Sequence, residues 1–157
     1  MRYNNYSLRR KRFTLYILFL FIFSASFLIM PFGIGADGSV NALLYIAGIC
    51  FWIGLIGIVA AFLSINSLRK SDTEFQEKYK GYRQIGIINF LKNPYACIAD
   101  GLMIISLVVL IIVRLLVNNN ILTMVFVSLF VFTFGMHCML NGINYIYIND
   151  RRRKRRE

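Results

Sequence analysis

Residues 13–30 read FTLYILFLFIFSASFLIM and contain no charged side chain. An α-helix rises about 1.5 Å per residue, so this stretch would extend over roughly 27 Å, close to the thickness of the hydrocarbon layer of a bilayer. Pro31 follows directly and ends the apolar run. Length and lack of charge therefore predict a membrane-spanning helix.

Three more apolar runs follow, at residues 40–65, 98–117 and 121–142. Each is long enough to cross a membrane, and buried helices of this length are rare in soluble proteins. The helical pattern of the last run continues to Ile148. The sequence predicts an all-α integral membrane protein, with four transmembrane helices packed as an antiparallel bundle.

The overall composition supports this fold class. Of the 157 residues, 58% are hydrophobic and 16% are charged, whereas soluble domains average about 25% charged residues. A soluble domain of this size could not bury so much apolar surface, and a disordered chain would be apolar-poor. Both classes are excluded, and the length excludes a multi-domain enzyme.

The net charge of +11 is concentrated in three segments. Seventeen of the 18 basic residues lie in the tails 1–12 and 149–157 or in the loop 67–97, which flank or interrupt the membrane domain 13–148. The positive-inside rule then places both termini and this loop in the cytoplasm.

The basic residues next to the spans are expected to contact anionic lipid headgroups. Those selected for this role are Arg9, Arg10, Lys11, Arg12, Arg114, Arg151, Arg152 and Arg153. Basic tracts also bind nucleic acid. Orientation and lipid contact already account for these tracts, so we do not expect nucleic acid as a partner.

The first run could instead belong to a cleaved signal peptide, because Ser24 and Ser26 have a small-x-small spacing. The apolar stretch continues past them to Met30, which is too long for a typical signal core. A retained signal anchor is the favoured interpretation.

The loops predict short local structures. Ser71 and Glu74 match a capping box, and an aromatic face at Phe75, Tyr79 and Tyr82 predicts a short amphipathic helix against the headgroups. Ser39 is a possible N-cap of the second span. Residues 118–120, all Asn, predict a tight hairpin between the last two spans.

Small residues repeat every three or four positions along the second span. They are Ala47, Cys50, Gly54, Gly57, Ala61 and Ser64. Such a seam lets another helix approach closely in lipid. We favour packing within one chain over a homo-oligomer interface.

The fourth span carries a polar edge. At 100° per residue, Thr133, His137, Asn141 and Asn144 fall on one sector, and Asp100 lies at a comparable depth in the third span. Contact of Asp100 with His137 or Asn141 is therefore geometrically possible. The cluster would be either an interhelical clasp, which we favour, or part of a path for a proton, ion or small polar solute.

Catalytic signatures such as HExxH, GxSxG or a P-loop are missing from the sequence. The run Met136–Met139, MHCM, holds soft metal ligands, but neighbouring helical residues point about 100° apart. The three cysteines imply no disulfide framework. We expect no enzymatic activity, no metal and no cofactor.

In outline, the chain is similar to small multidrug-resistance transporters and to bacteriocin-immunity or transporter-accessory proteins. The first span has no acidic residue that would couple cation and proton movement as in the transporters. Frequent Lys, Asn, Ile and Phe suggest a bacterium, and hence its cytoplasmic membrane. We expect a non-enzymatic protein of accessory or immunity type that packs against itself or a membrane-protein partner; the alternative is a small oligomeric transporter or channel.

Overall fold

The computed structural model describes residues 3–35, 37–81 and 93–150, and this part of the chain is helical apart from its turns and one isolated bridge. Four segments are long and apolar enough to cross a membrane, as predicted. The long helices are α1 (Tyr3–Ile29), α2 (Ala42–Lys70), α4 (Pro94–Ile112) and α5 (Asn120–Leu140). The shorter elements are η1 (Met30–Gly33), α3 (Thr73–Lys78), the π-helical turn η2 (Val113–Val117) and α6 (Ile143–Asn149).

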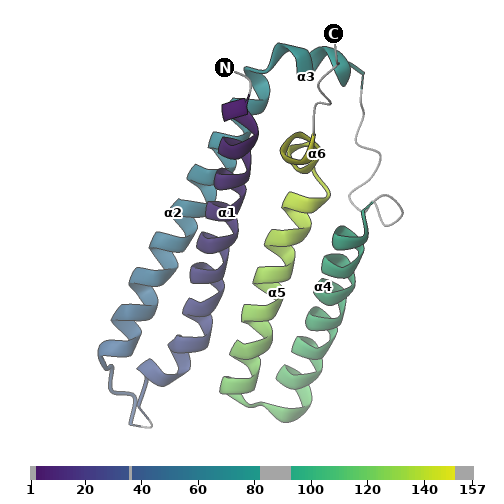
Figure 1. Ribbon diagram of the computed structural model, residues 1–157. Helices are drawn as coiled ribbons and strands as arrows, with labels where there is room; N and C mark the ends of the chain where they lie inside the picture. Colours follow the sequence, from purple (N-terminus) through teal and green to yellow (C-terminus); the bar gives the residue numbers. More distant parts are fainter. Residues whose placement is uncertain (1–2, 36, 82–92, 151–157) are drawn as a thin grey trace.

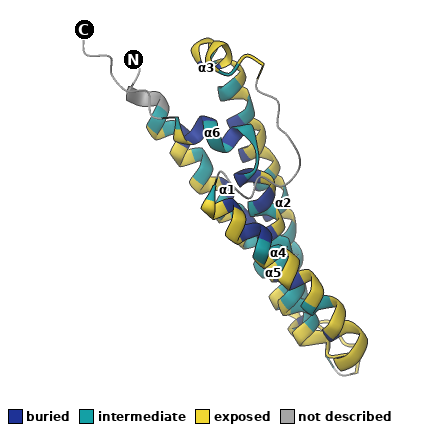
Figure 2. Ribbon diagram, turned by 90° about the vertical axis from the view of Figure 1, so that its right-hand side faces the viewer, coloured by how far each residue is buried: buried dark blue, intermediate teal, exposed yellow. Residues whose placement is uncertain are grey.

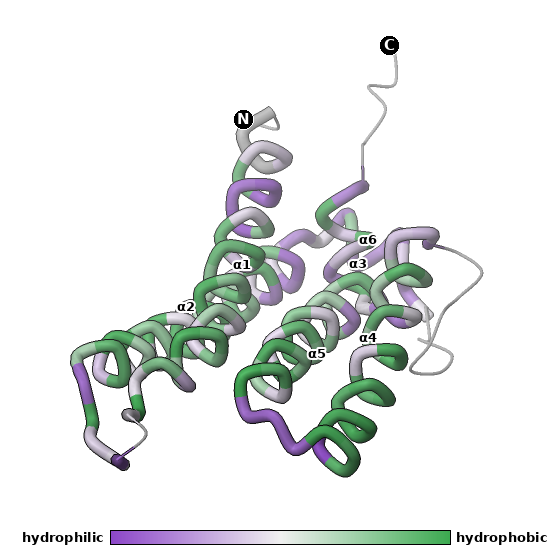
Figure 3. Tube along the Cα trace, turned by 90° about the horizontal axis from the view of Figure 1, so that it is seen from below, coloured by the Kyte–Doolittle hydropathy of each residue, from purple (hydrophilic) through white to green (hydrophobic). Residues whose placement is uncertain are grey.

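The four long helices stand in a row in the order α2, α1, α5, α4 (Figures 1 and 3). The main packing is between α1 and α2, between α1 and α5, and between α4 and α5. This single layer differs from the predicted bundle, in which every helix would pack on two neighbours. Lipid covers apolar helix faces without penalty, so no hydrophobic force closes the row in a bilayer.

Many buried residues lie near those ends of the long helices that adjoin α3 and α6 (Figure 2). The largest hydrophobic cluster there includes Tyr16, Ile65, Phe75, Met139 and Tyr147. The other surfaces of the long helices are apolar and exposed. The largest buried cluster therefore includes the short helices and the adjoining turns of α1, α2 and α5.

The small-residue seam of α2 faces α1. Ala47, Gly54, Gly57 and Ala61 are buried, while Cys50 and Ser64 are half-buried. A Cβ atom added to Gly54 would lie 2.6 Å from the backbone nitrogen of Phe23, so α1 and α2 approach to backbone contact here. The seam is thus occupied within the chain, which is the interpretation favoured from the sequence.

Several helix boundaries differ from those predicted. Helix α1 begins at Tyr3, so most of the basic tail 1–12 continues the first helix. Helix α2 extends past residue 65 to Lys70. Helix α5 ends at Leu140, and Gly142, in an extended conformation, separates it from α6. The apolar pattern up to Ile148 is therefore divided between two helices.

Two N-caps are also displaced from their predicted positions. Asn41, not Ser39, caps α2 by accepting a hydrogen bond from the Leu43 amide at 2.9 Å. Asp72, not Ser71, caps α3 by accepting one from the Phe75 amide at 3.1 Å. Asn and Asp are at least as good N-caps as Ser. Asn41 follows Ser39 by two residues and Asp72 follows Ser71 by one, so residue type alone could not show which of the two caps the helix.

The turn between η1 and α2 contains a hydrogen bond, from Ser39 to Asp37, that we expect to be lost at low pH. Asp37 accepts a hydrogen bond from the Ser39 amide at 3.0 Å. Hydrogen bonds from the Ser39 hydroxyl and amide lower the pKa of Asp37. The hydrogen bonds to the ionised carboxylate stabilise the turn fully at pH values above the ordinary carboxyl pKa, about 3.9. This stabilisation is lost as the pH falls through the lowered pKa of Asp37.

The measurement is the chemical shift of the Ser39 amide during an acid titration in micelles. Its midpoint should lie below the ordinary aspartate value, and Asp37→Asn should abolish the transition. A midpoint at or above the ordinary value would contradict the hydrogen-bonded turn.

Candidate functional site

Asp100 lies in the second turn of α4, and the start of that helix is well defined. The Asn93 side chain accepts a hydrogen bond from the Tyr95 amide at 3.1 Å, and Pro94 occupies the first helical position, where its missing N–H costs nothing. The same Asn93 donates to the Leu140 carbonyl at 3.4 Å. This bond connects the start of α4 to the end of α5, so both helix ends lie at one level.

Asp100, His137 and Asn141 meet between α4 and α5, and we call them the polar cluster. His137 Nδ1 lies 2.5 Å from Asp100 Oδ1. The side-chain nitrogen Nδ2 of Asn141 donates to both carboxylate oxygens of Asp100, at 3.0 and 3.2 Å. Asn141 Nδ2 also lies 3.1 Å from His137 Nδ1, so the tautomer of His137 decides which group donates; an ionised Asp100 accepts from Nδ1–H. Both contacts considered from the sequence are present in the structure.

Two of the three residues of the polar cluster are buried, and Asn141 is half-buried. Asp100 is fully buried and His137 is 6% exposed. Ala96, Ala99 and Leu140, from the same two helices, form a small buried hydrophobic cluster, and Phe13, Met136 and Tyr145 pack against it. A carboxylate in such a place is stable only when donors satisfy it. The arrangement therefore couples the positions of α4 and α5 tightly.

Two residues predicted for the polar edge do not join the cluster. The Thr133 hydroxyl donates within its own helix, to the carbonyls of Leu129 at 2.9 Å and Phe130 at 3.0 Å. Asn144 lies in α6 and accepts a hydrogen bond from Arg69 Nε at 2.9 Å. The helix break after Leu140 turns Asn144 away from the sector that a continuous helix would give it.

Helices α1 and α5 are joined by two hydrogen bonds that sequence reasoning missed. The Ser128 hydroxyl donates to the Ser24 carbonyl at 2.7 Å, and the Tyr16 hydroxyl donates to the Gly135 carbonyl at 2.8 Å. Isolated hydroxyls in an apolar helix give no sign of their partner, because backbone carbonyls are present everywhere. The contact is visible only once α1 and α5 are side by side.

Arg9 lies at the centre of a second polar network, at the end formed by α1, α3 and α6. Its guanidinium donates to Asp72 at 2.8 Å and to the Tyr147 carbonyl at 3.1 Å, and it lies 4.0 Å from the centre of the Tyr147 ring. Arg9 is only 4% exposed. This differs from the predicted headgroup contact, because Asp72 and Tyr147 turn the side chain inward.

Arg69 extends the Arg9 network to the end of α2. It donates to Asn144, as described above, and to the Asn66 side chain at 2.6 Å. Lys78 donates to Asp150 at 2.7 Å, and this hydrogen bond raises the pKa of Lys78. These contacts fix the two short helices, α3 and α6, against the ends of the long ones.

The aromatic face of the short helix α3 points into the protein. Phe75 is buried, with its ring centre 4.9 Å from that of Tyr147 and 4.5 Å from that of Tyr79. The predicted headgroup contact of this face is thus replaced by contact with α6. Tyr82 lies outside the described residues. A short amphipathic helix was predicted here, but its apolar partner was not.

The remaining predicted lipid-contact residues divide into three groups. Arg10, Lys11 and Arg114 are exposed, and Arg114 donates to Asn118 at 3.2 Å. Arg12 is half-buried. Arg151, Arg152 and Arg153 lie outside the described residues. Cys50, Cys97 and Cys138 are free thiols, and the described residues contain no group of three or more His, Cys, Asp or Glu arranged to hold a metal ion.

Comparison with protein-family models, curated proteins and solved structures finds no match for this chain. The polar cluster can do two things chemically: it can hold α4 against α5, and it can exchange a proton between an imidazole and a carboxylate.

Tyr147, which contacts Arg9, is expected to contribute measurably to the free energy of unfolding through its hydroxyl group. Its hydroxyl donates to the Leu68 carbonyl at 2.9 Å and joins α6 to α2. Tyr147→Phe should lower the free energy of unfolding by about 1 kcal/mol, the typical net value of such a bond. Denaturation by sodium dodecyl sulfate in mixed micelles measures this change. Tyr145→Phe, on the same helix, is the matched control and should have little effect; equal losses would contradict the assignment.

Proposed function

We propose that this chain is a multi-pass protein of the bacterial cytoplasmic membrane that works without enzymatic chemistry, through helix packing with itself or with a membrane-protein partner, as accessory or immunity proteins do. In this proposal the long helices run antiparallel. Both termini and α3 lie on the cytoplasmic side, where basic residues contact anionic headgroups.

One observation carries this proposal: the polar side chains that lie between the described long helices bond inside the protein. Asp100, His137 and Asn141 bond to one another, and the hydroxyls of Tyr16 and Ser128 bond to backbone carbonyls. Groups used in this way stabilise a packed arrangement. The surface left for a partner in the membrane is the set of apolar outward faces.

The proposed orientation is supported by the distribution of charge and by one ion pair. Seventeen of the 18 basic residues lie in the segments proposed to be cytoplasmic. Arg9, before the first apolar run, contacts Asp72, after the second, so these two segments lie at the same end. Such an arrangement agrees with an even number of crossings between the two positions.

Photo-crosslinking in intact cells tests the proposed mode of action. A photoreactive amino acid is placed at Ile56 on α2 or at Ile105 on α4, which are 64% and 59% exposed. We expect a defined protein adduct, either a dimer of this chain or one membrane protein, from at least one position. Adducts with lipid alone at both positions would overturn the proposal.

A second candidate function is transport, as a small oligomeric transporter or channel. The observation that favours it is the buried contact between two titratable groups, Asp100 and His137, inside candidate spans. In proteoliposomes, transport predicts a proton or cation flux that Asp100→Asn and His137→Gln each abolish. A flux insensitive to both substitutions, or no flux above that of empty liposomes, would remove this candidate.

A further inference from the structure

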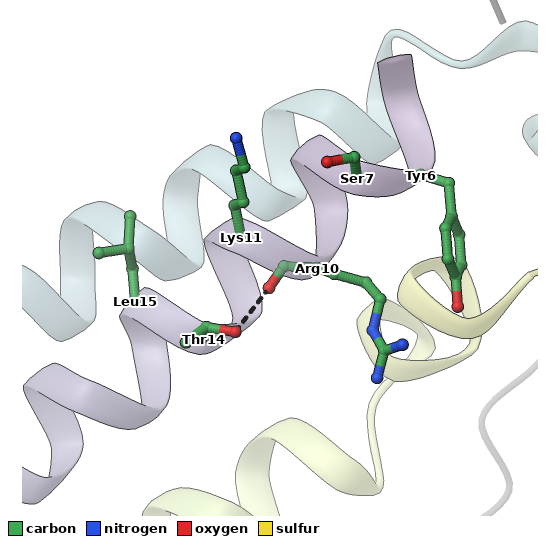
Figure 4. A pocket seen from close by; sticks show the side chains of 6 residues that line it. All are labelled: Tyr6, Ser7, Arg10, Lys11, Thr14 and Leu15. Carbon is green, nitrogen blue, oxygen red and sulfur yellow. Dashed lines mark hydrogen bonds between the residues drawn. The ribbon is translucent and has the colours of Figure 1, made fainter. Parts of the chain in front are cut away.

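A shallow hollow lies on the outer side of α1, near the start of the helix. Figure 4 shows the side chains that line it, and all come from α1. They are Tyr6, Ser7, Arg10, Lys11, Thr14 and Leu15. Arg10 and Lys11 leave the helix in different directions. Two cationic groups therefore border one concave surface.

Among the described residues, neither cation of this hollow belongs to an ion pair. At this end of the described structure the ion pairs join Arg9 to Asp72 and Lys78 to Asp150, and neither includes Arg10 or Lys11. The guanidinium carbon of Arg10 lies 5.9 Å from the centre of the Tyr6 ring. This cation–π contact keeps the guanidinium beside the hollow. The Thr14 hydroxyl already donates to the Arg10 carbonyl. The site therefore has two cations that fit an anionic ligand.

The position of the hollow along α1 matches the headgroup level of a bilayer. Arg10 precedes the first residue of the apolar run, Phe13, by three residues, or about 4.5 Å along the helix. The polar headgroup layer is roughly 5–7 Å thick on each side. A phosphate held by Arg10 and Lys11 would lie in this layer.

An apolar track continues from the hollow toward the centre of the membrane. Leu18 and Phe21 are exposed, and at 100° per residue they fall in the sector between Arg10 and Leu15. The surface therefore places cationic groups at headgroup level and apolar side chains below them. This order matches a lipid molecule, with a charged head and an acyl chain.

We infer that this hollow binds one anionic phospholipid, with its phosphate between Arg10 and Lys11 and an acyl chain along Leu18 and Phe21. The inference rests on the membrane placement proposed above and names one lipid partner at a defined site. Guanidinium groups bind phosphate oxygens in a forked geometry, so Arg10 supplies direction as well as charge.

The test counts lipids bound to the purified full-length protein by native mass spectrometry, during titration of neutral detergent micelles with phosphatidylglycerol or phosphatidylcholine. The test variant is Arg10→Gln/Lys11→Gln. The matched control is Lys70→Gln/Lys80→Gln, which removes the same charge from exposed positions at the same end. We expect the wild type to bind one phosphatidylglycerol preferentially, and the test variant to bind it roughly 30-fold more weakly, with the control unchanged.

Three results would overturn the inference. Equal losses in the two variants would show diffuse charge attraction, and equal binding of phosphatidylcholine would show a purely apolar contact. Competition by soluble glycerol phosphate at similar affinity would identify a free phosphate ligand instead of a lipid. Because bound lipid is counted in micelles without a partner protein, failure here is distinguishable from failure of the proposed partner contact, which crosslinking measures.

Discussion

His137→Ala is expected to lower the free energy of unfolding by about 3 kcal/mol. The substitution removes the imidazole that lies 2.5 Å from Asp100 and leaves a fully buried carboxylate with Asn141 as its remaining cluster partner. Removing one member of a buried pair costs about 3–5 kcal/mol in proteins, because the remaining charge is not compensated. Denaturation by sodium dodecyl sulfate in mixed micelles measures the change.

A double-mutant cycle separates this penalty from the value of the hydrogen bond itself. Asp100→Asn keeps an acceptor for His137 Nδ1 and should cost only about 1 kcal/mol, which is typical of a polar contact between membrane helices. The double variant Asp100→Asn/His137→Ala has no buried charge, so it should be more stable than His137→Ala alone. Thr133→Ala is the control, since that hydroxyl bonds within its own helix. A double variant no more stable than His137→Ala would contradict a buried carboxylate in need of a donor.

The apolar spans could be predicted because hydropathy and helix length are properties of the local sequence. The contact of Asp100 with His137 and Asn141 could also be predicted. A short loop makes the last two spans neighbours, so residues at the same depth in them lie close together. Asn144 was assigned wrongly because the 100° rule assumes an unbroken helix. The break after Leu140 involves Asn141 and Gly142, and neither residue type is sufficient to end a helix in an apolar sequence.

The network around Arg9 could not be predicted, because its members are far apart in the chain. Arg9 is 63 residues from Asp72 and 138 from Tyr147. In the sequence, Arg9 belongs to a run of four basic residues that all resemble topology signals. The contacts with Asp72 and Tyr147 separate the inward Arg9 from the exposed Arg10 and Lys11.

The open row of helices could not be predicted from hydropathy either. In water, exposed apolar faces would force four helices into a closed bundle, whereas lipid solvates those faces equally well. Order in the row therefore depends on close approach and a few polar bonds. Small residues join α2 to α1, hydroxyl bonds join α1 to α5, and the polar cluster joins α5 to α4.

Gly54→Leu is the second substitution expected to have a large effect, a loss of about 3 kcal/mol in the free energy of unfolding. Even a Cβ atom at this position would lie 2.6 Å from the Phe23 backbone nitrogen and 2.7 Å from its Cα. Backbone atoms cannot rotate away as a side chain can, so α1 and α2 must separate. Overpacking of this kind costs about 1–3 kcal/mol even where side chains can adjust.

Gly48→Leu is the matched control, because it lies on the same helix and an added Cβ has no atom within 4 Å. It should leave unfolding in mixed micelles nearly unchanged. Cysteine crosslinking between α1 and α2 should fall in Gly54→Leu and persist in Gly48→Leu. If both substitutions left stability and crosslinking intact, α1 would not occupy the seam. The same residues would then be available to a second copy of the chain, and close packing within the row would have to depend on the polar contacts alone.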